Sequence, residues 1–238
     1  MGIKYFVNEV FFKTWTPDMS YILGYLYADG SLEDASYLRG KYVRITSTDK
    51  ELVDFVKTSL NSQHKIIIIK PDSFQRKIRY FLRIGSHKLY DDLLALGLFP
   101  NKSLTMKFPK IPAKFLPHFI RGYFDGDGHV GIAKNRNKFN RMIIVFVSGS
   151  PDFLCSLANE LKTRLGLKTD KVYKSWRGHR LAYSTNDSVK IFKYLYKNTD
   201  GVFLTRKFGV FKNYFLDYNK WADFEVMRII NNYGAMVK

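Results

Sequence analysis

Two acidic residues stand in the same setting at two distant points of the chain. Asp29 and Asp127 are each followed by glycine, a residue that commonly ends a helix. The C-terminal end of a helix carries a partial negative charge, so a carboxylate there is repelled unless a cation offsets it. Oxygen ligands suit Mg²⁺, which usually keeps water and substrate phosphate in its shell. Paired acids around such cations favour phosphodiester chemistry, because two metal ions can stabilise both the attacking and the leaving oxygen.

Small residues with helical spacing precede both acids. Gly24 and Ala28 lie four residues apart before the first acid, and Gly122 and Gly126 repeat the pattern before the second. Residues four apart share one face of a helix, and small residues there let a second backbone approach closely. The matched spacing predicts two helices that pack on each other in parallel and bring both carboxylates together. Two solvated turn aspartates would explain either motif alone, but not the paired small-residue faces.

Basic residues outnumber acidic residues by a wide margin. The 238-residue chain has 39 Lys and Arg against 21 Asp and Glu, which gives a formal net charge of +18. A surplus of this size repels itself unless a polyanion takes it up, so we expect a nucleic-acid partner. The hydrophobic content of 46% excludes a chain that is disordered along its whole length.

The cysteine count and the apolar runs set further limits. Cys155 is the single cysteine, which excludes an internal disulfide framework and a Cys-based zinc cluster. It lies in an apolar-periodic run, which predicts a small core residue. No run of 18 apolar residues occurs, so we expect no membrane span. Residues 1–16 have no signal-peptide core, so we expect an intracellular protein that is not secreted.

The elements that must position the acids occur twice in the same order. Each acidic motif is predicted to end a helix, and two strands, an amphipathic helix, two more strands and a closing helix follow it. In the first half we expect strands at 31–37, 41–47, 65–70 and 79–84, with helices near 52–60 and 86–96. In the second half we expect strands at 129–134, 141–148, 171–176 and 179–184, with helices near 153–165, 187–196, 204–216 and 220–231.

This order predicts an α+β fold made of two pseudo-symmetric αββαββα repeats. We expect an N-terminal repeat at residues 1–108 and a C-terminal repeat with terminal helices at residues 113–238. The Pro-rich linker between them, residues 109–112, is short. The two halves are therefore predicted to pack against each other rather than to be loosely tethered.

The two motifs resemble those of a known enzyme family. Ile22-Leu-Gly-Tyr-Leu-Tyr-Ala-Asp-Gly30 and Ile120-Arg-Gly-Tyr-Phe-Asp-Gly-Asp-Gly128 resemble the motif of the LAGLIDADG homing endonucleases, in their single-chain, two-repeat form. The resemblance covers nearly the whole chain. It implies a monomer in which the motif helices form the inter-domain core and two antiparallel four-stranded sheets form a saddle over double-stranded DNA. It further implies a nuclease that cleaves both strands across the minor groove of a long, nearly asymmetric site.

The resemblance also assigns roles to residues of the motifs. The last acidic residue of each motif binds metal in the family, which maps onto Asp29 and Asp127, with the preceding Ala28 and Gly126 in the same site. Two or three Mg²⁺ or Mn²⁺ ions would be shared between the two acids. The sixth motif position is Tyr in the first copy and Asp125 in the second, and we predict a structural role for Asp125.

Basic residues late in each half complete the site that the resemblance implies. The candidates are Lys102 in the first half and Lys207 in the second. A lysine in this place could polarise the attacking water or neutralise phosphate charge in the transition state. Contact with backbone phosphate alone is the alternative for each of them.

Strand alternation suggests which side chains face DNA. Tyr42, Arg44 and Thr46 alternate with apolar residues, as do Arg79 and Arg83, and one polar sheet face could read bases in the major groove. The strand at 141–148 is apolar on both faces and cannot be oriented from the sequence. Further candidates for DNA contact are Glu33, Gln75, Arg76, Lys77, Asn135, Arg136, Lys138, Arg141, Lys174, Arg177 and Arg180.

Other functions remain open or are disfavoured by the residues. An RNA maturase or a non-catalytic DNA-binding regulator on the same scaffold is the main alternative. A calcium loop starting at Asp125 fails, because Val130 stands where glycine is needed and Arg136 where glutamate is needed. We do not expect a self-splicing intein, since the chain lacks a terminal His-Asn junction, and the five histidines lack the spacing of a His-Asn-His nuclease.

Overall fold

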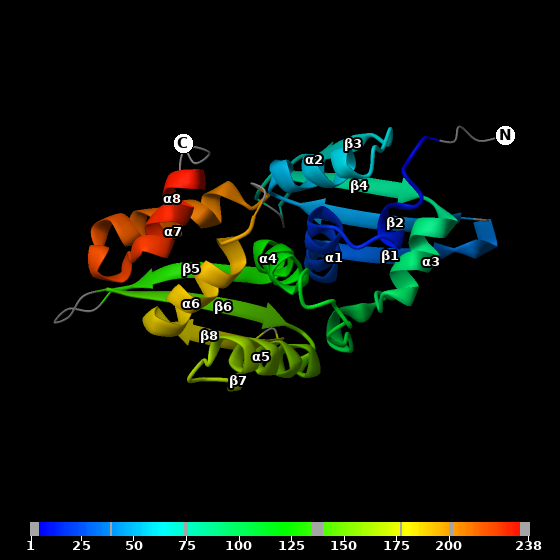
Figure 1. Cartoon of the computed structure of the whole chain (residues 1–238). Helices are drawn as coiled ribbons and strands as arrows, with labels where there is room; N and C mark the ends of the chain where they lie inside the picture. Colours follow the sequence, from blue (N-terminus) through cyan, green and yellow to red (C-terminus); the bar gives the residue numbers. More distant parts are fainter. Residues whose placement is uncertain are drawn as a thin grey trace.

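Two repeats of helices and strands make up most of the chain. The structure is a computed structural model, and it describes residues 5–38, 40–73, 76–134, 140–176, 178–199 and 202–233. The first repeat occupies one side of the molecule, and the second repeat with two further helices occupies the other (Figure 1). The predicted order of elements, αββαββα twice, is confirmed.

The described residues of the first repeat form four strands and three α-helices. Its elements are α1 (Pro17–Asp29), β1 (Gly30–Ala35), β2 (Gly40–Ser47), α2 (Lys50–Ser59), β3 (Ile66–Ile69), β4 (Arg79–Gly85) and α3 (His87–Ala95). The strands form an antiparallel sheet in the order β1-β2-β4-β3.

The second repeat follows the same plan and continues into two more helices. Its elements are α4 (Leu116–Asp127), β5 (Gly128–Ala133), β6 (Arg141–Ser148), α5 (Pro151–Leu165), β7 (Val172–Ser175), β8 (Gly178–Ser184), α6 (Thr185–Tyr196), α7 (Thr205–Asp217) and α8 (Phe224–Tyr233). Its antiparallel sheet has the order β5-β6-β8-β7, which matches the first sheet strand for strand.

Several helices begin at residues whose side chains satisfy free backbone N–H groups. The Thr16 hydroxyl accepts a hydrogen bond from the Met19 N–H at 3.1 Å, and Pro17 takes the first position of α1. The Ser86 and Ser150 hydroxyls accept from N–H groups three residues ahead, at the starts of α3 and α5. Proline at the first helical position and Ser or Thr before it are strong start signals, and they fix where each element begins.

The motif helices α1 and α4 lie side by side at the centre of the molecule (Figure 1). Residues 19–27 of α1 are all buried, including three tyrosines, and residues 118–125 of α4 are buried as well. A helix that is enclosed all round belongs to the core rather than to a surface. The apolar faces of both repeats meet on this helix pair and form one continuous core.

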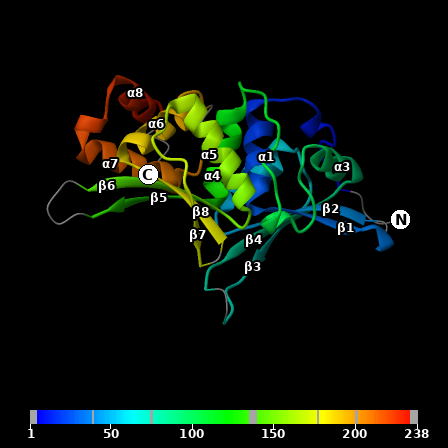
Figure 2. The ribbon, with the colours of Figure 1, turned by 90° about the horizontal axis from the view of Figure 1, so that it is seen from below.

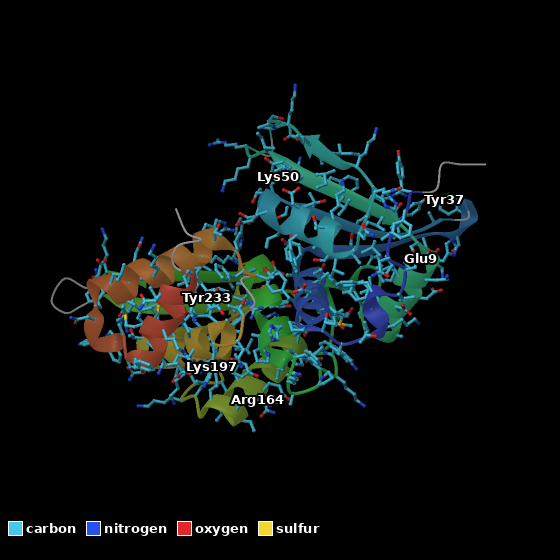
Figure 3. All side chains as sticks on the ribbon, turned by 45° about the horizontal axis from the view of Figure 1, so that its top comes forward. Glu9, Tyr37, Lys50, Arg164, Lys197 and Tyr233 are labelled. Carbon is cyan, nitrogen blue, oxygen red and sulfur yellow. The ribbon has the colours of Figure 1, made fainter. Side chains whose placement is uncertain are left out.

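The other helices gather on one side of the two sheets, and the opposite face of each sheet is left open (Figure 2). Long charged side chains such as those of Lys50, Arg164 and Lys197 project from the outer surfaces of the helical side (Figure 3). Lys50 pairs with Asp54 at 2.6 Å, within one helix. Exposed pairs of this kind contribute little to stability.

Three details differ from the sequence interpretation or complete it. Cys155 is exposed and not a core residue, because Phe153, Leu154 and Leu157 define the buried face of α5 and Cys155 points away from it. The last helix begins at Phe224 rather than near residue 220, and a carboxylate oxygen of Asp223 accepts from the Val226 N–H at its start. None of the helices in the described part of the chain is long and apolar enough to cross a membrane.

Candidate active site

The two motif helices pack so closely that a glycine of each helix lies against a backbone carbonyl oxygen of the other. A Cβ atom built on Gly24 would lie 2.0 Å from the carbonyl oxygen of Phe119, and one built on Gly122 would lie 1.9 Å from that of Tyr21. A Cβ on Gly126 would lie 2.4 Å from the Cβ of Ala28. No side chain fits at these points, so the small residues determine how closely the helices pack. The contacts are matched, since Phe119 and Tyr21 occupy equivalent places in the two repeats.

Asp29 and Asp127 meet at the ends of these helices. Burial raises the pKa of the Asp29 carboxyl to about 7, and the nearby Asp127 carboxylate raises it as well, against a lowering effect of Lys207. Burial also raises the pKa of Asp127, which Lys102 and Lys207 counteract. Two carboxylates that resist ionisation side by side are a pair that a cation would stabilise in the charged form.

A divalent cation fits this donor set. No group of three or more His, Cys, Asp or Glu side chains able to hold a metal occurs among the described residues. A cation between the two acids would therefore complete its shell with backbone carbonyl oxygens, water or a substrate oxygen. Mg²⁺ is usually held in this way, by one or two carboxylates with several waters retained.

Lys102 reaches the end of the first motif helix from the segment after α3. It is only 6% exposed, and its ammonium group contacts the carbonyl oxygen of Ala28 at 3.4 Å. Burial lowers the pKa of Lys102, while Asp127 and Asp29 act in the opposite direction. The contact is long for a hydrogen bond, so the ammonium group is positioned beside the acids without being tightly held.

Lys207 enters the end of the second motif helix from the start of α7. Its ammonium group donates to the carbonyl oxygens of Phe124 at 2.6 Å, Asp125 at 2.9 Å and Gly128 at 2.5 Å. Burial lowers the pKa of this lysine to about 8. Three donors on three carbonyl groups use the full capacity of an ammonium group and offset the negative helix end. Lys207 thus fastens the backbone that carries Asp127.

Asp125 is a buried residue of the helix interface. One of its carboxylate oxygens accepts from the Tyr21 hydroxyl at 2.7 Å and from the Leu204 N–H at 2.9 Å. The equivalent residue of the first repeat, Tyr27, donates to the Leu96 carbonyl oxygen at 2.9 Å instead and packs edge-on against Phe119. These contacts agree with a structural role for Asp125.

Two interactions of this region have no signal in the sequence pattern. The Arg206 guanidinium donates two hydrogen bonds to Asp49, at 2.7 and 2.8 Å, and so joins the start of α7 to the start of α2 in the other repeat. Buried Arg121 of α4 donates to the carbonyl oxygens of Leu195 and Val202, at 2.7 and 2.8 Å. Such pairs join residues more than 70 positions apart, and only the fold brings them together.

The open face of the first sheet holds a charged cluster. The Glu33 carboxylate accepts from Arg83 at 2.8 and 3.2 Å and from Arg44 at 3.2 Å. The Arg83 guanidinium also lies 3.5 Å from the centre of the Tyr42 ring. Four of the residues predicted to contact DNA are therefore neighbours on one surface, with exposed Thr46 on the same strand as Tyr42.

The remaining DNA-contact candidates are distributed in several places. Arg76 and Lys77 are exposed between β3 and β4, and Arg79 contacts Asp72 at 3.5 Å. Arg141 and Arg180 are exposed on the second sheet. Lys174 is paired with His179 across the strands, so its side chain is on the opposite side of the sheet from that of Arg180. Trp176, near the same sheet, is 88% exposed. Gln75, Asn135, Arg136, Lys138 and Arg177 lie outside the described residues.

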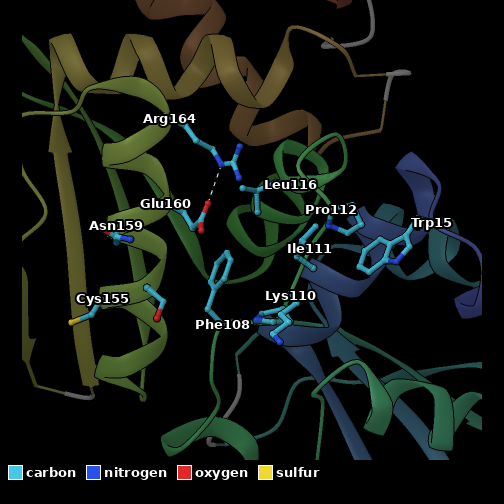
Figure 4. A pocket seen from close by; sticks show the side chains of 12 residues that line it. Trp15, Phe108, Lys110, Ile111, Pro112, Leu116, Cys155, Asn159, Glu160 and Arg164 are labelled. Atoms are coloured by element: carbon cyan, nitrogen blue, oxygen red, sulfur yellow. Dashed lines mark hydrogen bonds and ion pairs between the residues drawn. The ribbon is translucent and has the colours of Figure 1, made fainter.

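A cavity of about 840 Å³ lies on the helical side of the molecule, between the linker and α5 (Figure 4). Trp15, Phe108 and the exposed Cys155 are among the residues that line it. None of its lining residues is one of the two acids or two lysines of the candidate active site. The cavity therefore forms no part of that site.

The curated sequences that resemble the chain include two from one archaeal organism. The chain is 28% identical over 172 residues to a probable translation initiation factor IF-2 of Methanocaldococcus jannaschii, covering 68% of this chain and 13% of that protein. It is 31% identical over 119 residues to an uncharacterized protein of the same organism, covering 48% of this chain and 40% of that protein. The chain thus spans less than half the length of either relative.

Solved structures resemble the chain over most of its length. The LAGLIDADG meganuclease I-AabMI bound to uncleaved DNA gives a TM-score of 0.56 at 11% identity, covering 91% of this chain and 97% of that one. The homing endonuclease I-WcaI bound to its DNA recognition sequence gives a TM-score of 0.54 at 15% identity, covering 78% of this chain and 84% of that one. I-SmaMI bound to an uncleaved DNA target in the presence of calcium ions gives a TM-score of 0.51 at 13% identity, covering 94% of this chain and 100% of that one.

A family model identifies part of the chain directly. Residues 115–195, which run from the start of α4 into α6, match the LAGLIDADG-like domain. The whole chain shares its fold with the solved structures above, and its own two motif helices lie at its centre. The second repeat of this chain therefore matches the LAGLIDADG-like domain, and the whole chain has the LAGLIDADG fold with two repeats in one chain.

Proposed function

We propose that this chain is a site-specific, metal-dependent endonuclease that cleaves both strands of double-stranded DNA. The observation that carries the proposal is the meeting of Asp29 and Asp127 at adjoining helix ends, with Lys102 and Lys207 beside them. A carboxylate pair of this kind has no evident structural benefit, because it adds like charges to helix ends that are already negative.

Charge and shape support double-stranded DNA as the substrate. The net charge of +18 suits a polyanion, and the open sheet faces carry arginines that could contact bases or phosphates. The solved structures of I-AabMI and I-WcaI, which share the fold, are complexes with DNA. The chain has both repeats, so a single copy would cover both halves of an asymmetric site.

The residues of the site would have different roles, with the acids binding metal and the lysines neutralising charge or holding the backbone in place. The Asp29 and Asp127 carboxylates, with the carbonyl oxygens of Ala28 and Gly126, would hold Mg²⁺ or Mn²⁺. When bound, such ions supply positive charge that stabilises the attacking and leaving oxygens. Lys102 stands beside the acids, where it can neutralise a phosphate oxygen. Lys207 keeps Asp127 in place by fastening the end of α4.

The test begins with a target, which the protein can select for itself. Wild-type protein and Mg²⁺ are incubated with a random DNA library, and cleaved sites are sequenced. Asp29→Asn and Asp127→Asn are then compared on the selected site. Losing a metal ligand should lower the cleavage rate by about a thousandfold, the effect of several kcal/mol of lost transition-state stabilisation, and leave DNA affinity largely unchanged.

A control variant removes an acidic side chain elsewhere in the second repeat, the repeat that contains Asp127. Asp170 is exposed and pairs with Lys162 at 2.5 Å, so Asp170→Asn should cleave at the wild-type rate. Full activity of either site variant would refute the assignment of the two acids. A wild-type protein that binds DNA but never cleaves it would support a non-catalytic regulator instead.

A further inference from the structure

The central strand of the second sheet presents apolar side chains on the open face. In β6, Met142, Ile144 and Phe146 are fully buried towards the helices. The residues that alternate with them, Ile143, Val145 and Val147, therefore point to the opposite face. Val147 is 42% exposed, and the other two are partly exposed. The structure thus shows which side chains of the apolar strand at 141–148 face the open side of the sheet, which the sequence pattern alone does not.

The neighbouring strands extend this surface with small residues. Val145 lies between His129 of β5 and Ala182 of β8, and Ile143 lies between Gly131 and Ser184. Residues paired across antiparallel strands share a face, so these side chains surround the apolar row. The apolar strip, defined as Ile143, Val145, Val147 and Ala182, contains no charged group.

The same place in the first sheet has the opposite chemistry. On β2 the residues of the open face are Tyr42, Arg44 and Thr46. Arg44 is bonded to Glu33, whose carboxylate also holds Arg83. The two sheets share their strand order but differ in what they can recognise. Hydrogen-bonding groups line one, and methyl groups line the other.

We propose that the apolar strip reads thymine methyl groups in the major groove, in the half of the DNA site that the second sheet covers. The proposal rests on the DNA-binding part of the proposed function. The C5-methyl of thymine is the apolar feature that bases display in the major groove, and aliphatic side chains cannot donate or accept hydrogen bonds there. The first sheet, with Arg44 and Arg83, reads hydrogen-bonding base edges instead.

Charge around the strip argues for DNA rather than for a protein partner. Arg141 begins the same strand, and Arg180 lies directly opposite Val147 on β8; both are exposed. Cations at both ends of the strip suit phosphate groups on either side of a groove. The strip also continues the open side shared by both sheets (Figure 2).

The experiment replaces thymine by deoxyuridine, which removes the methyl group and keeps every hydrogen-bonding group. The replacement is made separately in each half of a site selected from the random library, and affinity is measured by fluorescence anisotropy with Ca²⁺ as the metal. In one half each replacement at a contacted thymine should weaken binding about fourfold, the effect of one buried methyl group. Replacement in the other half should have little effect.

Two variants assign the sensitive half to a sheet. Val145→Thr exchanges a methyl group for a hydroxyl at nearly constant shape and keeps a residue that suits strands. It should weaken binding to thymine DNA and abolish the sensitivity to deoxyuridine. The matched control Thr46→Val makes the reverse exchange on the first sheet and should leave that sensitivity unchanged.

The outcomes separate this inference from the proposed function. If no DNA is selected or bound, the proposed function fails. If DNA is bound but deoxyuridine has no effect in either half, or Val145→Thr leaves the sensitivity intact, the thymine inference alone is refuted. A dimer of the free protein that dissociates on Val145→Asp would assign the strip to a second copy and would also refute it. A monomer at the same concentration supports DNA as the occupant.

Discussion

At the scale of single residues, the two acids of the motifs are held in an unfavourable setting. Asp29 and Asp127 share a largely buried space, and their pKa values rise because the folded protein favours the protonated forms. Lys102 and Lys207 relieve the repulsion only in part. Because folding disfavours the charged forms of these two carboxyl groups, a bound cation should stabilise the folded protein. This stabilisation can be measured without any DNA.

The first prediction concerns the stability of the metal-free protein as a function of pH. The pKa of Asp29 is about 7 in the folded protein, against an ordinary value of 3.8. The stability contribution of this group is therefore complete below pH 3.8 and is lost as the pH rises through 7. Asp29→Asn should gain in free energy of unfolding relative to wild type across this range, as urea titrations at pH 4 to 8 in EDTA would measure.

Two controls accompany this measurement. Asp170→Asn should show the reverse trend or none, because Lys162 lowers the pKa of the exposed Asp170 carboxyl. Mg²⁺ should stabilise the wild type at pH 8 more than Asp29→Asn. A constant difference between wild type and Asp29→Asn at all pH values would show that Asp29 is not perturbed by folding.

At the scale of elements, the helix pair α1 and α4 is the feature on which the site depends. Gly24 and Gly122 each face a carbonyl oxygen of the other helix, so the backbones themselves are in contact. The distance between the helices sets the distance between the acids that end them. A change at these glycines should therefore affect stability and chemistry together.

Gly122→Ala tests this dependence. The new Cβ would lie 1.9 Å from the Tyr21 carbonyl oxygen, so the helices must separate, and overpacking of this kind costs about 1–3 kcal/mol in the free energy of unfolding. Cleavage should fall further than stability alone explains, because the acids move apart. The control Thr58→Ala, at an exposed position of α2, should change stability by less than about 0.5 kcal/mol. Wild-type stability in Gly122→Ala would contradict the close approach.

The sequence predicts these elements well and the supporting contacts poorly. Local signals led to elements that the structure contains, as the repeated Gly24 and Gly122 patterns and the alternation in β2 show. Cys155 was misread because an apolar run does not show where the buried face of a helix ends. The Arg206–Asp49 bond depends on chain segments far apart and leaves no periodic trace.

At the scale of the whole molecule, the repeats are joined by more than the central helices. The Thr205 hydroxyl contacts the Glu51 carboxylate at 2.9 and 3.0 Å, next to the bond between Arg206 and Asp49. These contacts hold the start of α7 against the first repeat. Lys207 is the next residue along α7, so the junction between the repeats also positions the lysine that fastens the end of α4.

A double-mutant cycle measures this junction. Asp49→Asn, Arg206→Gln and the double variant should give a coupling energy of about 1 kcal/mol, because the guanidinium and carboxylate bond through two parallel hydrogen bonds. The control cycle uses Lys50 and Asp54, an exposed pair within α2, and should give about 0.3–0.5 kcal/mol. Equal coupling in the two cycles would show that the junction is only a surface contact.

The two repeats contribute different side chains to the contacts between α1 and α4, and this difference limits how the halves can be combined. Asp125 needs the Tyr21 hydroxyl, whereas the equivalent of Tyr21 in the second half is Phe119. Two copies of the second half, paired around the same axis, would each place a buried carboxylate against a phenyl ring, at a cost of several kcal/mol. Each half is therefore matched to the other rather than to itself. A duplicated ancestor with identical halves would have lacked this discrimination, and exchanging halves between proteins of this fold should succeed only when these facing residues are exchanged with them.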